Sequence, residues 1–148
     1  RRVIRDPNTN LKDNIIKKVV ICSGKVFYNL LEERENRKLD SVKILRLEQI
    51  YPFPYSTLKE ILSDTPNAEF VWCQEEPKNM GAWFFVDRKI EDVLRSFKAK
   101  FSRPSYAGRA EAASPATGSL SRHNKEQADL VNEALETTTK KTTKHAAE

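Results

Sequence analysis

The sequence is poor in the residues that usually build catalytic and metal centres. Histidine and cysteine occur twice each among 148 residues. Neither pair has the spacing of a metal site or of a cysteine–histidine or serine–histidine–aspartate arrangement. His145 lies in a Thr/Lys-rich stretch, and His123 stands beside Arg122 at the start of a helical pattern. We therefore expect no catalytic residue and no metal site in this chain.

Long hydrophobic runs and segregated charge are also missing. No apolar run approaches the roughly 20 residues that a membrane-spanning helix needs. Charged residues make up 32% of the chain and give a net charge of +5, but basic and acidic residues alternate, as they do in residues 32–38. A nucleic-acid-binding surface would instead gather its cations on one face. We expect a soluble domain whose partners include neither nucleic acid nor membrane.

Glycine is scarce, with four in the chain. The sequence contains neither the GxGxxG fingerprint of dinucleotide-binding folds nor the GxxxxGK[ST] phosphate loop. Ser23-Gly24-Lys25 separates a predicted strand from a predicted helix, where free backbone N–H groups can hold an anion. Without either glycine pattern, a tight turn is favoured over a phosphate site.

The two cysteines, Cys22 and Cys73, each end a run of β-branched and aromatic residues. This pattern predicts buried structural thiols at strand ends, and it implies a reducing compartment.

What the sequence does contain is a regular alternation of strand and helix patterns. Short apolar runs typical of buried strands occupy residues 18–22, 42–47 and 69–73, with a weaker extended piece at 104–108. Connections of this length allow crossovers between parallel strands. The alternation therefore predicts an α/β fold with three layers, α/β/α, a mostly parallel sheet and Rossmann-like topology.

Each predicted strand is followed by a helix with an apolar face. The second helix has a start signal, because Thr57 could cap its first turn while Glu60 reaches back. The last helix would place Ala128, Val131 and Leu135 on one face. We expect residues 1–17 to be a lead-in segment or linker, residues 18–136 to be the domain, and residues 137–148 to be a disordered Thr/Lys-rich tail.

Polar and aromatic residues gather after the third strand. Glu75 and Glu76 follow it directly, but neighbours on an extended chain point in opposite directions, which disfavours a catalytic carboxylate pair. Residues 83–85 are Trp-Phe-Phe, and successive helical side chains diverge by about 100°. Some of this aromatic surface therefore needs a partner beyond one core; core packing and interface use both stay open.

Four blocks of the sequence carry a family resemblance over roughly residues 18–135. They are residues 21–28 (ICSGKVFY), 46–54 (RLEQIYPFP), 70–83 (FVWCQEEPKNMGAW) and the closing pair 106–109 (YAGR) and 113–118 (ASPATG), followed by 123–127 (HNKEQ). They resemble the C-terminal domain of the thiamine diphosphate-dependent, decarboxylating component of 2-oxoglutarate dehydrogenase, a transketolase-like family.

The resemblance implies a transketolase C-terminal-domain-like fold. It also implies a parent enzyme that decarboxylates 2-oxoglutarate on thiamine diphosphate and Mg²⁺ and passes a succinyl group to a lipoyl arm. The family's cofactor signature, a GDG with a downstream asparagine pair, is absent from this sequence, so no cofactor is expected in this segment. The implied partners are the preceding domains, a homodimer partner and the lipoyl succinyltransferase core. The implied compartment is the bacterial cytoplasm, with the mitochondrial matrix as the alternative.

Two roles follow as hypotheses for a segment without its own catalytic centre. The first is docking and dimer assembly through a set of interface residues: Gln74, Glu75, Glu76, Asn79 and Trp83. The second is a regulatory anion or nucleotide site formed by three cations at strand ends: Lys25, Arg46 and Arg109. The alternative to both is a free-standing flavodoxin-like nucleotide-binding module.

Overall fold

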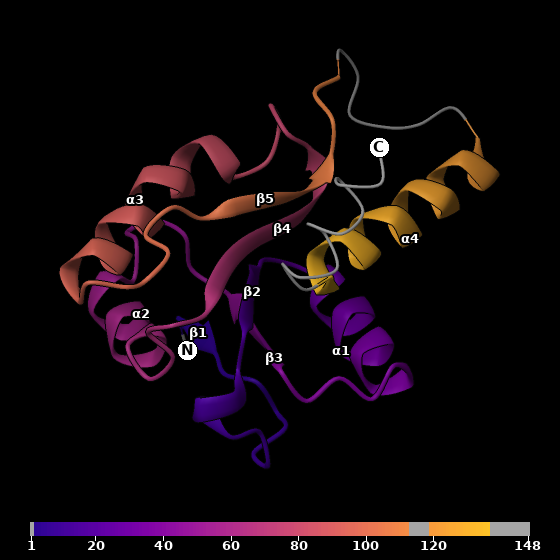
Figure 1. Cartoon of the computed structure of the whole chain (residues 1–148). Coiled ribbons are helices and arrows are strands. Elements are labelled where there is room, and N and C mark those ends of the chain that lie inside the picture. Colours follow the sequence, from indigo (N-terminus) through magenta and orange to yellow (C-terminus); the bar gives the residue numbers. More distant parts are fainter. Residues whose placement is uncertain (1, 113–118, 137–148) are drawn as a thin grey trace, which may run out of the picture.

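The structure, a computed structural model, describes residues 2–112 and 119–136. Within these residues, a five-stranded sheet lies between two layers of helices (Figure 1). The strands are β1 (Val3–Ile4), β2 (Lys18–Cys22), β3 (Val42–Leu47), β4 (Glu69–Pro77) and β5 (Ser105–Arg109). The helices are α1 (Val26–Asn36), α2 (Tyr55–Leu62), α3 (Trp83–Ser96) and α4 (Leu120–Leu135), with a 3-10 turn at Asp13–Ile15.

The strand order is β1-β3-β2-β4-β5, and all neighbours pair in parallel except β1, which runs antiparallel to β3. Helix α1 connects β2 to β3 on one face, and α2 then carries the chain to β4 on the other face. The direction of winding therefore reverses between β2 and β4. In open α/β sheets, functional residues gather beyond the carboxyl ends of the strands near such a reversal.

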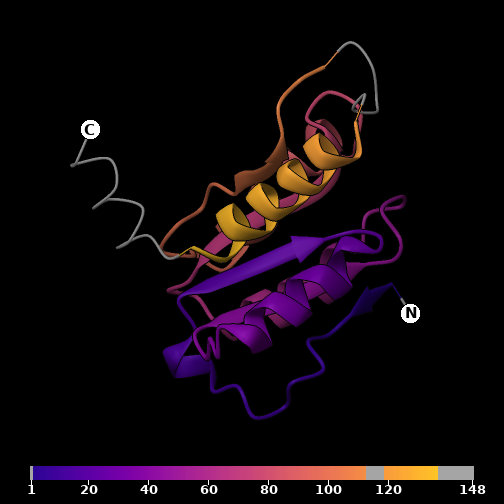
Figure 2. The same cartoon turned by 90° about the vertical axis from the view of Figure 1, so that its right-hand side faces the viewer.

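Two separate hydrophobic cores cover the two faces of the sheet, because successive strand residues point to opposite sides. Val19 and Ile21 pack with the side chains of α2 and α3. Val20 and Cys22 pack with those of α1 and α4. Figure 2 shows α1 and α4 side by side over their face. The predicted three-layer, mostly parallel α/β fold is confirmed.

The segment predicted as a lead-in is tied to the sheet. Val3 and Ile4 pair with β3, and the carboxylate of Asp6 accepts hydrogen bonds from the guanidinium of Arg34 and from the backbone N–H of Ile44. Asp6 and Arg34 are both buried. This pairing was not predictable from the sequence, because a two-residue strand is too short for a hydrophobic period to be visible.

Three local expectations are corrected. Strand β4 continues to Pro77 instead of ending at residue 73, so Gln74, Glu75 and Glu76 belong to the strand and Cys73 lies inside it. Helix α2 begins at Tyr55, directly after Pro54, and Thr57 lies inside it and does not cap it. In α4 the buried positions are Leu130, Val131, Ala134 and Leu135, and Ala128 is exposed.

The two cysteines are in-register neighbours on β2 and β4, and both are fully buried free thiols. The predicted tail, residues 137–148, lies outside the described residues. Among the helices that the structure describes, none combines the length and the apolar character required to span a membrane.

Candidate functional site at the carboxyl ends of the strands

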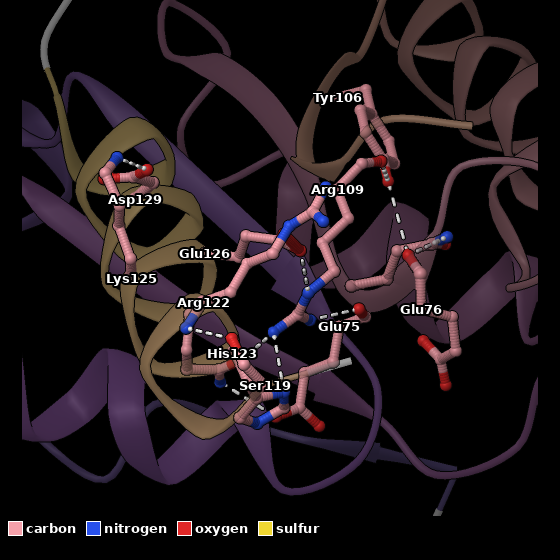
Figure 3. Close-up of polar contacts among 12 residues, drawn as sticks. Glu75, Glu76, Tyr106, Arg109, Ser119, Arg122, His123, Lys125, Glu126 and Asp129 are labelled. Carbon is pink, nitrogen blue, oxygen red and sulfur yellow. Dashed lines mark hydrogen bonds and ion pairs between the residues drawn. The ribbon is translucent and has the colours of Figure 1, made fainter. Parts of the chain in front are cut away.

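The ends of β4 and β5 meet α4 in a network of polar side chains (Figure 3). Arg109, the last residue of β5, is its centre, and only 10% of its side chain is exposed. Its Nε donates to Oε1 of Glu126 over 3.2 Å, and one terminal nitrogen donates to the backbone carbonyl of Glu75. The other donates to Oε1 of Gln127 over 3.1 Å and lies 3.5 Å from Nδ1 of His123.

Gln127 continues the network toward α1. Its amide nitrogen donates to Oε1 of Glu75 over 2.8 Å and to Oδ1 of Asn29 over 3.3 Å. Glu126 also accepts from Nε of Arg122, whose side chain is exposed. The planar guanidinium of Arg109 thus joins β4, β5 and α4. Arginine suits this position better than lysine because its rigid fork directs several N–H donors at once. We call Arg109, Glu75, Glu126 and Gln127 the arginine clamp.

The start of α4 has its own cap. Ser119 has an extended backbone conformation, and its hydroxyl accepts a hydrogen bond from the backbone N–H of Arg122 over 3.2 Å. A serine in this position satisfies one of the N–H groups that a helix start leaves free. The cap fixes where α4 begins and so aligns His123, Glu126 and Gln127 on the face toward Arg109.

A second polar centre lies on the other side of β4. The Oε1 atom of Gln74 accepts from Nε1 of Trp72 over 2.8 Å and from the backbone N–H of Trp83 over 3.1 Å. Its amide nitrogen donates to the carbonyls of Glu76 and Pro77. Gln74 is 1% exposed, and without its Oε1 atom the buried N–H groups of Trp72 and Trp83 would lose this acceptor. Gln74 therefore fixes the turn between β4 and α3.

Two glycines allow close approach at this centre. A Cβ on Gly81 would lie 2.5 Å from the amide nitrogen of Gln74, and one on Gly108 would lie 2.6 Å from the hydroxyl of Tyr106. That hydroxyl donates to the carbonyl of Arg109 over 2.6 Å. Burial, with a smaller electrostatic contribution from Cys73, raises the pKa of Tyr106 to about 12. The phenol therefore acts as a neutral hydrogen-bond donor and not as an acid at ordinary pH.

The structure separates the residues predicted to form an interface. Gln74 and Trp83 are buried inside the domain, with 1% and 6% exposed, so neither presents a side chain to a partner. Sequence analysis placed both residues beyond the third predicted strand, where polar and aromatic residues gather. Glu75 is partly buried in the arginine clamp, whereas Glu76 and Asn79 are exposed. An interface role for the exposed pair stays a prediction.

The three predicted anion-binding cations lie in different surroundings. Lys25 is exposed beside Gly24, whose positive φ of 83° confirms the predicted tight turn. Arg46 donates to the hydroxyl of Tyr28 over 3.2 Å and its guanidinium lies 5.6 Å from that ring's centroid. Arg109 directs its donors to the clamp. The regulatory hypothesis stays a prediction for Lys25 and Arg46, and the clamp offers a structural role for Arg109.

The partners of Arg109 on α4 were missed by sequence analysis. Their spacing was the available signal, because His123, Glu126 and Gln127 stand at i, i+3 and i+4 of one helix and so share a face. The predicted closing loop at 113–118 lies outside the described residues.

Nucleophilic or metal chemistry has little support among the described residues. Burial raises the pKa of Cys73 to about 12, and it also raises the pKa of Cys22, with Cys73 adding to that effect. Thiols of this kind stay protonated and unreactive. In residues 2–112 and 119–136 no three His, Cys, Asp or Glu side chains are grouped so that they could hold a metal ion.

Comparison of the sequence with known proteins identifies related proteins. Residues 1–135 match the family model described as 2-oxoglutarate dehydrogenase C-terminal. The chain is 56% identical over 124 residues to proteins named 2-oxoglutarate dehydrogenase E1 component from Brucella anthropi, Brucella ovis and Brucella suis. The matched segment is 84% of this chain but only 12% of the length of these relatives.

Among solved structures, one described as a split gene transketolase, inactive beta4 tetramer, is similar over 80% of this chain and 38% of its own, with a TM-score of 0.49 and 13% identity. The family match over nearly the whole chain and the 56% identity agree with each other and with the resemblance seen in the sequence. This chain belongs to the 2-oxoglutarate dehydrogenase C-terminal family.

Proposed function

We propose that this chain is the C-terminal domain of a 2-oxoglutarate dehydrogenase E1 component and that it serves assembly of the enzyme rather than its chemistry. The observation that carries the proposal is the 56% identity to E1 components over 84% of the chain. The catalytic centre would then lie in the remainder of the polypeptide, because the matched segment is 12% of those proteins and this sequence lacks the cofactor signature of the resembled family. The free-standing flavodoxin-like module is not favoured, since the relatives are much longer proteins.

The parent reaction would be decarboxylation of 2-oxoglutarate with transfer of a succinyl group to a lipoyl arm. Thiamine diphosphate with Mg²⁺ would supply the electron sink for that decarboxylation, as in the resembled family. The described residues of this segment do not fit this group: they offer no cluster of metal ligands and no glycine-rich phosphate loop. We therefore assign none of its binding contacts to this chain.

In this proposal the domain contributes a rigid docking surface at the carboxyl ends of β4 and β5. The arginine clamp fixes α4 against β4 and β5, and Gln74 fixes the turn into α3. Gln74 also donates to the carbonyl of Glu76, and the side chain of Asn79 makes two hydrogen bonds with the backbone of Ala112, so both exposed residues are held at the surface. A rigid surface loses little conformational entropy on docking, which favours assembly.

The proposed partners are the preceding domains of the same polypeptide, a second copy in a homodimer, and the lipoyl succinyltransferase core of the multienzyme complex. The proposed compartment is the bacterial cytoplasm and the proposed pathway is the tricarboxylic acid cycle. The relatives named above are bacterial, which supports the first of the two compartments considered.

The decisive experiment compares the full-length parent with a version that ends before Arg2. Ending there removes β1 as well, so no unpaired strand remains. Decarboxylation of 2-oxoglutarate is followed by ferricyanide reduction, and oligomeric mass by light scattering. Loss of both dimer and activity is the expected result. A truncated protein that stays dimeric and fully active would contradict the proposal.

A point variant tests the role of the clamp in assembly without removing the whole domain. Arg109→Ala removes the centre of the clamp, and Arg122→Ala removes an exposed partner of the same Glu126. We expect the first to weaken dimerisation and activity together and the second to leave both near wild type. Equal effects of the two substitutions would show that the clamp has no special part in assembly.

A further inference from the structure

Exposed aromatic rings connect the β3–α2 loop to α3. Tyr51 is 81% exposed and stacks edge to face on Phe85, which is 38% exposed, with ring centroids 6.1 Å apart. The ammonium of Lys89 lies 4.9 Å from the Phe85 centroid. Tyr55, 40% exposed, donates from its hydroxyl to the carbonyl of Asp92 on α3. We call Tyr51, Tyr55, Phe85 and Lys89 the aromatic patch.

The loop holds Tyr51 outward by its own packing. Phe53 packs against the hydrophobic core, and Pro54 is buried at the start of α2. Gln49 braces the loop by donating to the carbonyl of Pro52 over 3.2 Å. The exposed ring is therefore fixed by anchored neighbours on both sides. Contiguous exposed aromatic surface of this kind typically marks an interface, where tyrosine is enriched.

The N-terminal strand β1 begins beside the loop that carries Tyr51. The carbonyl of Arg2 accepts hydrogen bonds from the backbone N–H groups of Glu48 and Gln49, over 3.0 and 3.3 Å. Gln49 is two residues from Tyr51. Because β1 is antiparallel to β3, any polypeptide that precedes Arg2 leaves the domain at the carboxyl end of β3, next to the aromatic patch.

We propose that the aromatic patch is the docking surface for the domain that directly precedes this chain in the same polypeptide. The inference rests on the proposed function, since it takes the chain to be the C-terminal part of a longer E1 component. A domain that joins the chain directly before Arg2 would reach this surface at high effective concentration, because Arg2 lies beside the patch. The match of the relatives leaves 88% of their length outside the matched segment, which is ample for such a domain.

The patch also defines the chemistry of its partner surface. The Tyr51 and Phe85 rings would be covered by apolar side chains. Lys89 would lose water at the rim, so a carboxylate beside it is needed to offset the desolvation of its charge.

Covering of the patch is measured by thiol labelling of the full-length protein. Tyr51→Cys and Phe85→Cys are labelled with a maleimide, and each rate is read on its own peptide by mass spectrometry. The same variant in concentrated urea supplies the unprotected rate. Phe101→Cys is the matched control, because Phe101 is 40% exposed and precedes β5, at the opposite edge of the parallel sheet.

We expect both patch cysteines to be protected by about tenfold or more relative to urea, and the control to be protected far less. Equal labelling of patch and control would overturn the proposal. Two patch variants are used so that one which fails to fold does not leave the question without an answer.

The identity of the covering surface is read by photo-crosslinking. The photoreactive residue p-benzoylphenylalanine replaces Tyr51 in full-length protein mixed from isotopically light and heavy copies. Cross-links to the sequence preceding Arg2 within one isotopic copy support the proposal. Cross-links only between light and heavy copies would overturn it by showing that a second subunit covers the patch, and absence of any cross-link outside this segment would overturn it as well.

The outcome for the docking surface can be distinguished from the outcome for the proposed assembly function. Loss of activity on truncation together with an unprotected Tyr51→Cys would remove only the docking surface. A protected patch in a parent whose truncated form remains dimeric and active would remove only the assembly role.

Discussion

Gln74 makes four hydrogen bonds: its side chain accepts from two buried N–H groups and donates to two backbone carbonyls. Replacing it with methionine keeps the volume and removes every one of these hydrogen bonds. We expect Gln74→Met to lower the free energy of unfolding by about 2–4 kcal/mol, because the indole N–H of Trp72 and the backbone N–H of Trp83 lose their acceptor. Urea-induced unfolding measures the change.

The matched control is Gln49→Met, since the amide of Gln49 makes an exposed hydrogen bond to Pro52. Its effect should stay within about 0.5 kcal/mol. Equal losses for the two glutamine variants would contradict the assignment of Gln74 as a buried hub.

Gly81 is required by the same hub, because a Cβ there would meet the Gln74 amide at 2.5 Å. We expect Gly81→Ala to cost about 1–3 kcal/mol in the wild-type background. In a Gln74→Ala background the obstructing amide is absent, so the additional cost should largely disappear. A double-mutant cycle by urea unfolding tests this coupling, and strict additivity would show that the clash is not the cause.

At the scale of elements, the buried pair of Asp6 and Arg34 joins the N-terminal segment to α1 and β3. Asp6→Ala would remove the buried carboxylate from Arg34 and leave it the exposed carboxylate of Glu35 and the carbonyl of Val42, and we expect a loss of about 3–5 kcal/mol. Arg5→Ala is the control, because Arg5 pairs with Glu60 at 3.7 Å with both side chains exposed. It should cost no more than about 1 kcal/mol. Guanidinium-induced unfolding of both variants gives the comparison.

Elements were predictable where hydrophobic pattern alone decides them. The buried strands β2 and β3 stood out as short apolar runs, since both of their faces are covered. The end of β4 was not predictable in this way, because Gln74 and Glu75 are polar and their place in the strand depends on partners in β5 and α4.

The candidate site was predictable only in part for a related reason. Arg109 was identified as a cation at a strand end, but its partners come from β4 and α4. Which elements meet at Arg109 follows from strand order, and a single sequence does not reveal strand order when several crossovers are possible. The exposed ring of Tyr51 was likewise invisible, because loop sequence does not state which of several aromatic residues packs inward.

At the scale of the whole molecule, three groups whose pKa values are raised by burial couple stability to alkaline pH: Cys22, Cys73 and Tyr106. The pKa of Cys73 is raised from 9.0 to about 12, and that of Tyr106 from 10.0 to about 12, with burial as the main cause in each. Between the unfolded and folded pKa values only the unfolded chain releases these protons. The free energy of unfolding should therefore fall as pH rises above about 9, by up to about 1.4 kcal/mol per pH unit for each proton.

Urea unfolding between about pH 8 and about pH 11 measures this slope. Cys73→Ala should flatten it by removing one of the groups, whatever its effect on absolute stability. A slope in the variant equal to that of the wild type would show that the Cys73 thiol does not titrate differently in the two states.

The sheet separates two hydrophobic cores, one shared with α2 and α3 and the other with α1 and α4. Ile90 and Leu30 belong to different cores. The losses in free energy of unfolding caused by Ile90→Val and Leu30→Val should therefore add in the double variant. Residues on the face that carries the aromatic patch can thus be substituted as the partner surface changes. The packing of the face beneath the arginine clamp is not altered by these substitutions. The central sheet in this way gives one small domain two surfaces that can evolve separately.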